Sequence, residues 1–362
     1  MSLICCENCF YAQELKEAVR CNGVIGTCPL CGSEDVRLFN AEQVSIERLS
    51  DIINVLVAAY AMYDPLWHNV VSKEFVKSLP LHLKSIKGLF RLPAKKIKTV
   101  LEGVGIGQGY LNGQVIPKYL NPNMDFSELS VFKDGRWTFD DFVDSLHHSR
   151  RFHSGETIRD DNLNLLFSEC SEIVRAGTLY NRARVVSYDE NLSVESVGAP
   201  PFSKAKDGRV SPAGIPVLYL ADSENTALSE IRARVTDHVF LAQFKVEKDL
   251  TILDLTQLKD MSPFAVSNDF AFYLMNYPVV EKMASVFTSP SRNEDNCFEY
   301  LATQFLCEHA KNNGWHGVKY ASTIAPHGYN LALFNPDSAT AIESSLKHVQ
   351  ISACPRYRIV RT

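Results

Sequence analysis

The stretch GRVSPAGIPVLYLADSENTALSEIR, residues 208–232, decides the fold class of the second half of this chain. Residues 217–221, VLYLA, form a short apolar run that predicts a buried strand. Asp222 or Ser223 then supplies a side-chain oxygen that caps a helix. Glu230 flanks the apolar stripe of that helix, so we expect its carboxylate near the boundary between helix and sheet. The apolar positions of the predicted helix are Ala227, Leu228, Ile231 and Val235.

Strands and helices alternate on both sides of this stretch. The segment GTLYNRARVVSY, residues 177–188, predicts a strand with Arg182 and Arg184 on one face, because strand side chains alternate with a period of two. A downstream helix is predicted from apolar residues at helical spacing, with Gly314 as its C-terminal stop. The pattern predicts a mixed α+β domain. The downstream helix and two more strands are expected at residues 298–314, 317–322 and 329–334.

Four blocks of this sequence, in order, resemble the RES domain, a family named for its Arg, Glu and Ser. The blocks are LYNRARV, GRVSPAGIPVLYLADSENTALSEI, EYLATQFLCEHAKNNGWHGVKYAS and GYNLALF. The resemblance implies a fold related to ADP-ribosyltransferases and an activity directed at NAD. Family members act as toxins that degrade NAD by hydrolysis or phosphorolysis, or that transfer ADP-ribose to a protein. The cysteine-rich start and the helical segment after it resemble the zinc-ribbon HEPN/RES-type N-terminal domain of longer RES proteins.

The resemblance also implies the residues of the site. The family's Arg falls in NRAR, where we favour Arg182 and keep Arg184 as the alternative, and its Tyr falls on Tyr219. The family's Glu falls on Glu230 and its Ser on Ser322, so Glu230, Arg182 and Ser322 are the expected catalytic residues. Further contacts with NAD are expected from Arg184, Arg209, Tyr219 and Asn330.

These residue types suit the chemistry of NAD cleavage. The bond between nicotinamide and ribose breaks through an oxocarbenium-like state, which a carboxylate such as Glu230 can stabilise. A guanidinium, from Arg182 or Arg184, can bind the pyrophosphate with paired hydrogen bonds. Tyr219 can stack on the nicotinamide or hydrogen-bond the ribose. Taken singly, each of these residues is typical of an ordinary strand, helix or core, and only the ordered blocks point to a site.

Two CxxC pairs near the start of the chain predict a structural zinc site. Cys6 and Cys9 form the first pair, Cys28 and Cys31 the second, and 18 residues separate the pairs. Two such knuckles place four thiolates around one ion in a tetrahedron, as in a zinc ribbon, and leave no open position for catalysis. The other cysteines are Cys5 as an alternative to Cys6, Cys21 as a spare thiol, and the scattered Cys170, Cys297, Cys307 and Cys354.

The segment between the cysteines and the RES-like part has a helical pattern. Residues 45–63 carry apolar residues at helix spacing, and the glycine-rich residues 102–113 predict a flexible loop, since they lack the Lys-Ser/Thr of a phosphate-binding loop. An amphipathic helix followed by a polar linker is expected from Arg136, with His147, His148 and His153 as solvated helix-end residues. We therefore expect three parts: a zinc ribbon at 1–40, a mainly helical regulatory or interaction domain at 41–165 and a RES domain at 166–362.

The composition and net charge of the chain limit the classes of protein to which it can belong. The 362 residues are 46% hydrophobic and 22% charged, with a formal net charge of −5, which disfavours a general nucleic-acid coat protein but leaves room for a local basic surface. No secretory signal and no membrane span of about 18 apolar residues is visible, so a cytoplasmic protein without membrane contact is expected.

The leading hypothesis is a toxin-like enzyme that cleaves NAD by hydrolysis or phosphorolysis. The alternatives are a protein ADP-ribosyltransferase with a protein acceptor, and a non-catalytic zinc-ribbon adaptor or sensor whose RES-like half only binds a nucleotide. The expected partners are NAD and an antitoxin or immunity protein. Contact of the zinc ribbon with nucleic acid stays open.

Overall fold

A computed structural model gives the fold of this chain. It describes residues 3–149, 157–189, 193–232, 234–258, 261–264, 269–288 and 300–351. His153, Cys297 and Cys354 lie outside the described residues, as does most of the predicted polar linker.

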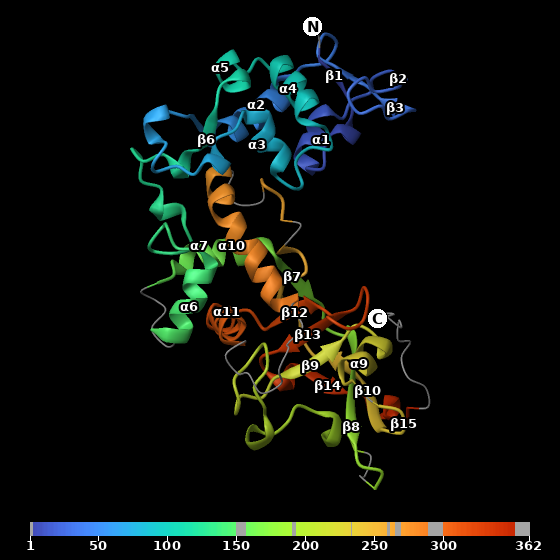
Figure 1. The fold of residues 1–362 in the computed structure, drawn as a ribbon. Helices are drawn as coiled ribbons and strands as arrows, with labels where there is room; N and C mark the ends of the chain where they lie inside the picture. The colour runs from blue at the N-terminus through green and yellow to red at the C-terminus, as the bar shows by residue number, and fades with distance from the viewer. Residues whose placement is uncertain are drawn as a thin grey trace, which may run out of the picture. The chain divides into compact units, whose positions relative to one another are not determined.

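The chain forms two compact units, and each is described by itself (Figure 1). The first unit comprises Met1–Trp137, Gly155–Asn162 and Asp260–Pro278, and the second comprises Thr138–Ser154, Leu163–Lys259 and Val279–Thr362. The predicted boundaries at residues 40 and 165 stay predictions. None of the helices in the described part of the chain combines the length and the apolar character needed to cross a bilayer.

The first unit consists of short antiparallel strand pairs and helices. Strand β1 pairs with β4, β2 with β3, and β5 with β6. The strands are β1 (Ile4–Cys5), β2 (Ile25–Gly26), β3 (Val36–Arg37), β4 (Phe39–Asn40), β5 (Tyr60–Met62) and β6 (Val115–Pro117). The helices are α1 (Gln13–Val19), α2 (Glu47–Ala58), α3 (Leu79–Ser85), α4 (Ala94–Gly103) and α5 (Gln108–Asn112).

Two predictions for this unit need correction. The helix expected over residues 45–63 ends at Ala58, because the following residues pair as β5 with β6 and the buried Tyr60 packs against His82. The glycine-rich segment is only partly a loop, since residues 108–112 form α5. Gly105, with φ of +85°, follows the end of α4, and Leu111 anchors the short α5 by its burial.

The cysteine-rich start and the helices of the first unit share one hydrophobic core. Cys9 and Cys28 belong to the same cluster of buried residues as Leu49 of α2 and Ile97 of α4. Each of these side chains is at most 1% exposed, and burying an aliphatic side chain contributes about 1.5–3 kcal/mol. The geometry of the cysteines is therefore coupled to the stability of the helices.

The second unit is built around one mixed sheet that carries helices. Among the described residues, nine strands form this sheet in the order β14-β10-β8-β9-β13-β12-β11-β7, with β15 also paired to β10. The strands are β7 (Ser171–Val174), β8 (Leu179–Val186), β9 (Leu218–Ala221), β10 (His238–Val246), β11 (Leu250–Asp254), β12 (Gly317–Ala321), β13 (Tyr329–Leu333), β14 (Ala339–Ala341) and β15 (Lys347–Gln350). The helices are α6 (Phe139–His148), α7 (Asp160–Glu169), α8 (Val194–Val197), α9 (Glu224–Glu230), α10 (Phe270–Thr288) and α11 (Leu301–Asn312), of which α7 and α10 also have residues in the first unit.

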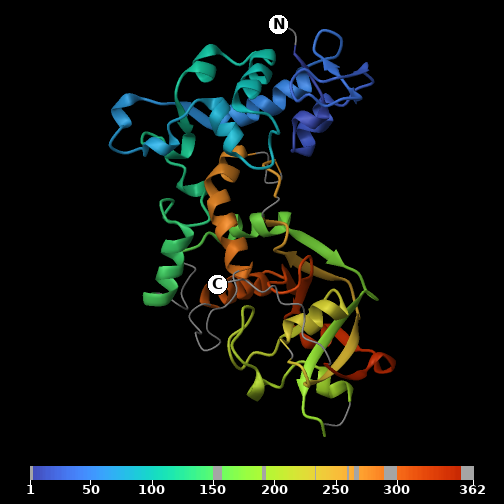
Figure 2. The same ribbon diagram turned by 45° about the vertical axis from the view of Figure 1, so that its right-hand side comes forward.

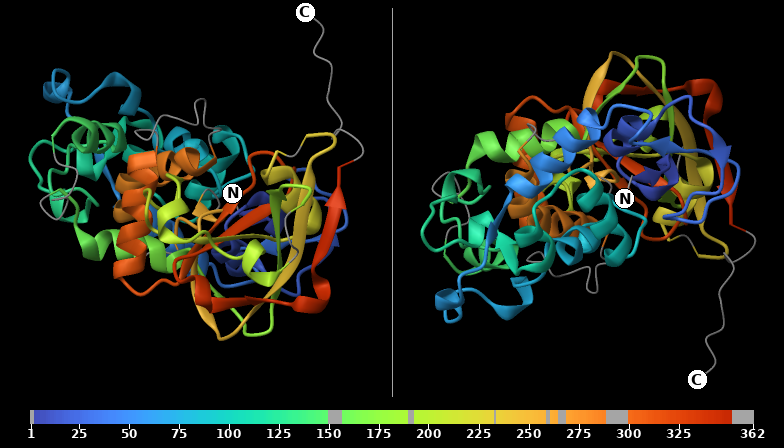
Figure 3. Two further views of the ribbon diagram at one scale, coloured as in Figure 1. Left: turned by 90° about the horizontal axis from the view of Figure 1, so that it is seen from below. Right: turned by 90° about the horizontal axis from the view of Figure 1, so that it is seen from above.

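The predicted strands and helices of this unit are present, and the fold class α+β is confirmed. β11 and β12 are parallel, and the other neighbouring strands are antiparallel. Helix α9 lies against β8 and β9 (Figures 2 and 3). Gly314, with φ of +94°, follows the end of α11 as predicted.

Helix α9 is shorter than predicted. Ser223 is its N-cap and accepts a hydrogen bond from the Thr226 amide. Of the two expected caps, Asp222 and Ser223, the structure therefore selects Ser223. The helix ends at Glu230, and the expected helical residue Val235 lies beyond it and is 41% exposed. The reason is the turn that leads into β10, in which Arg232 has a φ of +48°. Glu230 is therefore the last residue of its helix.

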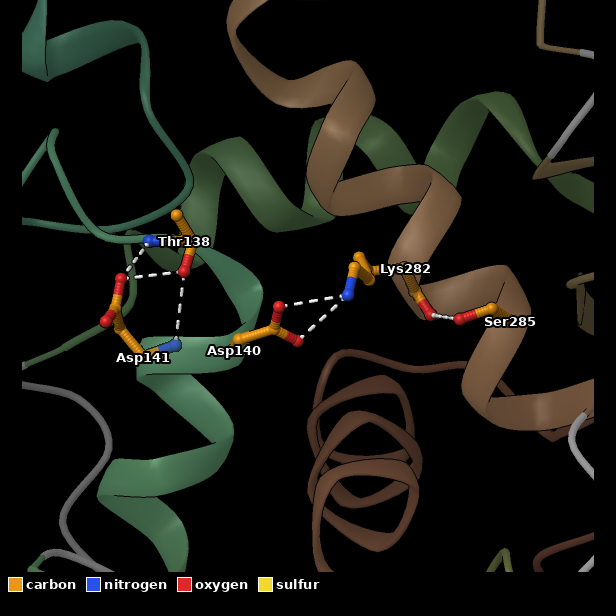
Figure 4. Close-up of polar contacts among 5 residues, drawn as sticks. All are labelled: Thr138, Asp140, Asp141, Lys282 and Ser285. Carbon is orange, nitrogen blue, oxygen red and sulfur yellow. Dashed lines mark hydrogen bonds and ion pairs between the residues drawn. The ribbon is translucent and has the colours of Figure 1, made fainter.

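The helix predicted near residue 136 is also present, as α6 (Figure 4). Thr138 and Asp141 form a capping box, in which each side chain accepts the backbone amide of the other residue. Asp140 on the first turn accepts hydrogen bonds from Lys282 of α10, with Nζ 2.9 Å from Oδ2 and 3.2 Å from Oδ1. The pair joins α6 to the C-terminal half of α10.

A buried ion pair joins the two parallel strands. Lys319 Nζ on β12 lies 2.8 Å from Asp254 Oδ2 on β11 and 3.0 Å from Glu172 Oε2 on β7. Burial acts to raise the pKa of Asp254, but hydrogen bonds from Lys319, Thr256 and Gln257 outweigh it and hold the pKa below its ordinary value. The aspartate is 1% exposed, so loss of its charge leaves a buried ammonium group with fewer partners.

We expect Asp254→Asn to lower the free energy of unfolding by about 3 kcal/mol near neutral pH. A carboxyl group whose pKa is lower in the folded than in the unfolded state stabilises the fold at pH values above its unfolded-state pKa. This stabilisation disappears as the pH falls through the folded-state pKa. The difference from wild type should therefore shrink between about pH 5 and about pH 3, as followed by urea denaturation. Asp249→Asn, at an exposed ion pair with Arg175, is the control and should change stability far less than Asp254→Asn. A pH-independent difference for Asp254→Asn would contradict the linkage.

Candidate functional site at the divergence of two strands

The candidate site lies where β8 and β9 separate within the sheet. In the described part of the chain, these two strands are paired at Asn181 with Ala221 alone. Beyond this point the side chain of Arg182 spans the gap, and its Nη1 donates to the carbonyl oxygen of Tyr219 at 2.7 Å. The Arg182 side chain thus takes the place of backbone hydrogen bonds between β8 and β9. The separation of the two strands leaves space for a pocket.

Arg182 is held by backbone carbonyls rather than by a carboxylate. Besides Tyr219, it donates from Nε to Val197 O at 2.7 Å and from Nη2 to Gly198 O at 3.3 Å. Burial, with the nearby Arg184 guanidinium, lowers the pKa of Arg182 to about 10, so it stays a cation at neutral pH. No ion pair of Arg182 with an acidic residue is found within the described ranges. A largely buried cation whose described partners are all neutral keeps its positive charge uncompensated, and this favours binding of an anion.

Glu230 receives two hydrogen bonds on one carboxylate oxygen. Ser322 Oγ donates to Glu230 Oε1 at 2.5 Å, and Asn330 Nδ2 donates to the same atom at 2.8 Å. Oε2 has no hydrogen-bond partner among the residues that the structure describes. The donors fix the orientation of the carboxylate and leave its second oxygen available for a developing positive charge.

The hydroxyl of Ser322 can donate only toward Glu230. Its oxygen accepts the backbone amides of Ala325 at 2.8 Å and Ile324 at 3.2 Å, which occupy its acceptor positions. The loop that makes these contacts approaches α9 closely at Gly328, where a Cβ atom would clash with the Thr226 side chain. The loop between β12 and β13 therefore positions the serine against the end of α9.

Four of the predicted site residues line one pocket of about 240 Å³. Two further polar residues of its lining, Asn181 and Tyr320, were missed by the sequence analysis. Asn181 is 7% exposed, and its buried Oδ1 has no hydrogen-bond partner in the part of the chain that the structure describes. An asparagine inside a strand is uncommon, which is a signal that could have singled it out. The predicted residues in the lining are Arg182, Tyr219, Glu230 and Asn330.

Tyr320 and Tyr219 present neutral phenol groups at this pocket. Tyr320 faces Asn330 across the pairing of β12 with β13, a contact that only the strand register reveals. Burial, with Tyr219 and Glu230 close by, raises the pKa of Tyr320 well above its ordinary value. Burial also raises the pKa of Tyr219 to about 12. Both side chains can therefore act as hydrogen-bond donors or stacking surfaces, and neither is a base at neutral pH.

The other two predicted arginines lie outside this pocket. Arg184 is exposed, and its Nη1 donates to Ser196 O at 2.5 Å. Arg209 donates from Nη1 to Val286 O at 3.1 Å and Phe287 O at 2.7 Å, where a cation suits the C-terminal end of α10. Of the two arginines of NRAR, the structure thus places Arg182 at the pocket and Arg184 outside it.

A second pocket of about 360 Å³ adjoins Ser322. It is lined by Thr256 and by residues 321–329, the loop between β12 and β13 with its flanking strand ends. Ser322 lines this pocket while its hydroxyl reaches Glu230 in the first. The two pockets are therefore connected through one hydroxyl group.

The four cysteines of the two CxxC pairs come together in the first unit. Their sulfur atoms all lie within 4.8 Å of one another, with Cys6 Sγ 3.4 Å from Cys31 Sγ and Cys9 Sγ 3.6 Å from Cys28 Sγ. Sulfur atoms that surround a zinc ion at about 2.3 Å are separated by about 3.8 Å in a tetrahedron. Gly32, with φ of +78°, closes the second knuckle by donating its amide to Cys28 O. The four cysteines could hold a metal ion, and this donor set fits zinc.

Burial and hydrogen bonds shift the pKa values of Cys6 and Cys31 in opposite directions. Burial, with hydrogen bonds from neighbouring cysteines, raises the pKa of Cys6 to about 12. Burial acts to raise the pKa of Cys31 too, but hydrogen bonds with Ser33 outweigh it and lower this pKa to about 7. Cys5 is buried outside the group, and Cys21 donates to Leu38 O at 3.6 Å. Cys6 is thus the ligand candidate in preference to Cys5.

A second, weaker group lies at the end of α6. The ligand atoms of Asp144, His147 and His148 lie within 4.8 Å of one another, but the aspartate and His148 are exposed. Both histidines are in the last turn of the helix, where a positive charge is favourable. This arrangement agrees with solvated helix-end residues.

Comparison with known proteins assigns part of the second unit to a domain family. Residues 183–353 match the family model of the RES domain, and this part of the chain is a RES domain. No curated protein matches the chain. One solved structure that it resembles is the M. tuberculosis MbcT–MbcA toxin–antitoxin complex, with 17% sequence identity, coverage of 52% of this chain and 91% of that chain, and a TM-score of 0.29.

Proposed function

We propose that the RES domain of this chain binds NAD and cleaves the bond between nicotinamide and ribose. The single observation that supports this most is the Glu230 carboxylate at the pocket, with two donors on Oε1 and an Oε2 to which none of the described residues donates. The family resemblance supplies the substrate class, and the geometry supplies groups suited to it.

Glu230 would act on the transition state of this cleavage. As nicotinamide leaves, positive charge develops on the ribose ring, and a fixed carboxylate stabilises it without having to reorganise. Ser322 and Asn330 hold the carboxylate in place, so little motion is required when the bond breaks. Their role in this scheme is to position Glu230.

Arg182 would bind the negatively charged part of the substrate. A guanidinium has five N–H groups, and three backbone carbonyls account for three of them. Two remain for a phosphate oxygen or a ribose hydroxyl. The absence of an acidic partner for this cation in the described residues supports an anionic ligand such as a pyrophosphate.

The size of the pocket suggests which end of NAD it accepts. At about 240 Å³ it is smaller than the roughly 300–1,000 Å³ of pockets that enclose a complete ligand. We therefore place the nicotinamide and its ribose in the pocket, with the remainder of the molecule extending out of it. Tyr219 and Tyr320 supply aromatic surface for the nicotinamide ring.

The test is to incubate the purified full chain with NAD and to separate the products by chromatography with mass detection. We expect release of nicotinamide. In hydrolysis, water adds to the ribose carbon and gives ADP-ribose and a proton. In phosphorolysis, inorganic phosphate adds instead and gives ADP-ribose 1″-phosphate, so omission of phosphate separates the two reactions.

Two other results would redirect the proposal. Label from adenine-labelled NAD that appears on a protein would identify ADP-ribose transfer to a protein acceptor. NAD that binds and stays intact over hours would identify a nucleotide-binding adaptor or sensor and contradict catalysis. An antitoxin or immunity protein is a further proposed partner, implied by the family, and co-expression with the product of a neighbouring gene would test it.

We also infer that Cys6, Cys9, Cys28 and Cys31 hold one structural zinc ion. Four thiolates complete a tetrahedral shell and leave no position for substrate, so the ion would stabilise the first unit and take no part in NAD chemistry.

A further inference from the structure

The first unit contains one strongly basic segment. Residues 75–101 carry seven Lys and Arg and no Asp or Glu, although the formal net charge of the chain is −5. This segment covers α3, the loop after it and most of α4. A local charge of this size produces a positive field that the composition of the whole chain conceals.

Hydrogen bonds connect this segment to both CxxC knuckles, through its backbone at the first and through a lysine side chain at the second. Tyr11 N donates to Leu89 O at 2.9 Å and Arg91 N donates to Cys9 O at 3.0 Å, at the first knuckle. Lys96 Nζ donates to Pro29 O at 3.2 Å, at the second knuckle. The basic segment therefore packs directly against the cysteine-rich start.

An exposed aromatic ring of the cysteine-rich start lies beside one of these cations. The guanidinium carbon of Arg91 lies 4.8 Å from the centre of the Tyr11 ring, at cation–π distance. The tyrosine is 52% exposed, and Arg91 is exposed as well. Stacking with the guanidinium holds the ring in an orientation that leaves part of it open to a ligand.

The start of α4 adds to the positive potential. Its N-cap, Pro93, offers no side-chain hydrogen bond, and the first turn carries no acidic residue but has Lys95 and Lys96. Cations at this end of a helix oppose the helix dipole, and an anion there is favoured by both the dipole and the lysines. Among the acidic residues of the first unit, Glu7 pairs with Arg20, Oε1 of Glu14 accepts a hydrogen bond from Ser262, and Glu102 near the end of α4 pairs with Lys98.

We propose that this surface, which we define by Tyr11, Lys87, Arg91 and Lys95, binds single-stranded nucleic acid. The cations suit a phosphate backbone, and the exposed ring suits an unpaired base that stacks on it. An acidic protein segment would use the cations but gain little from the ring. The combination of aromatic and basic side chains therefore favours a single strand over an acidic polypeptide.

The test is fluorescence anisotropy with the full chain and a labelled mixed-sequence single-stranded RNA or DNA, between about 50 and about 200 mM salt. We expect binding that weakens with salt. The triple variant Lys87→Gln, Arg91→Gln, Lys95→Gln should bind at least about tenfold more weakly and reduce the log–log salt slope by about 2, since each lost phosphate contact contributes about 0.7. The control carries the same change of charge on exposed lysines of the RES domain: Lys204→Gln, Lys206→Gln and Lys248→Gln.

Variants of Tyr11 test the stacking part of the proposal. Tyr11→Ala should weaken binding about tenfold, and Tyr11→Phe, which keeps the ring, should bind within about twofold of wild type. Circular dichroism and zinc content show whether each variant is folded. The proposal is overturned by a wild-type protein that does not bind at about 50 mM salt, or by a triple variant that equals the lysine control. Equal competition by polyglutamate, with no effect of Tyr11→Ala, would also overturn it and point to an acidic protein partner.

Discussion

The variant Glu230→Gln should release nicotinamide from NAD about 10²–10³-fold more slowly than wild type, with nearly unchanged NAD affinity. Glutamine has the shape of glutamate, and its Oε1 can still accept the hydrogen bonds from Ser322 and Asn330 that the structure shows at Glu230. The substitution therefore removes the negative charge and keeps the geometry. Because the charge stabilises the transition state more than bound substrate, kcat should fall while KM changes little.

Two variants serve as comparisons for Glu230→Gln. Glu224→Gln removes a carboxylate from the first turn of the same helix, where it forms an exposed ion pair with Lys347, and should leave turnover unchanged. Ser322→Ala removes one donor to Glu230 and should have an intermediate effect of roughly tenfold, since the Asn330 contact remains. Nicotinamide release is measured in stopped-time assays. Wild-type activity of Glu230→Gln in these assays would show that the Glu230 carboxylate does not have the proposed role.

The second large effect is expected at the cysteine cluster. Cys9→Ser should reduce bound zinc from one ion per chain to nearly none and unfold the first unit. Cys9 is fully buried in the core that α2 and α4 share, so loss of the ion removes support from these helices as well. Zinc-finger peptides gain about 10–16 kcal/mol from their metal, and this free energy enters folding directly.

Cys21→Ser is the matched control for this prediction. Cys21 belongs to the same segment but lies outside the four-sulfur group, and its thiol contacts Leu38 O. Its variant should keep one zinc and the wild-type melting temperature. The measurements are elemental analysis of the purified chains and thermal unfolding followed by circular dichroism. Unaltered zinc content in Cys9→Ser would show that this cysteine is not a ligand.

Much of the local structure follows from short-range patterns in the sequence. The strand at residues 218–221 was predicted, and the cap at Ser223 is one of the two expected, since both features depend on neighbours in the chain. The two CxxC pairs were recognisable for the same reason, because each knuckle is a local turn that two thiols share. The length of α9 was overestimated, since the apolar spacing continues to Val235 but the chain turns into β10 after Glu230.

The sequence by itself determined which residues are chemically suited to the site, and the tertiary structure decided which of them meet. Glu230 contacts Ser322 across 92 residues and Asn330 across 100, and these contacts depend on the register between β9, β13 and β12. Arg182 and Arg184 look equivalent in the sequence, because strand alternation puts them on one face. Only Arg182 borders the opening between β8 and β9, and pairing between distant strands, which no local pattern encodes, creates that opening.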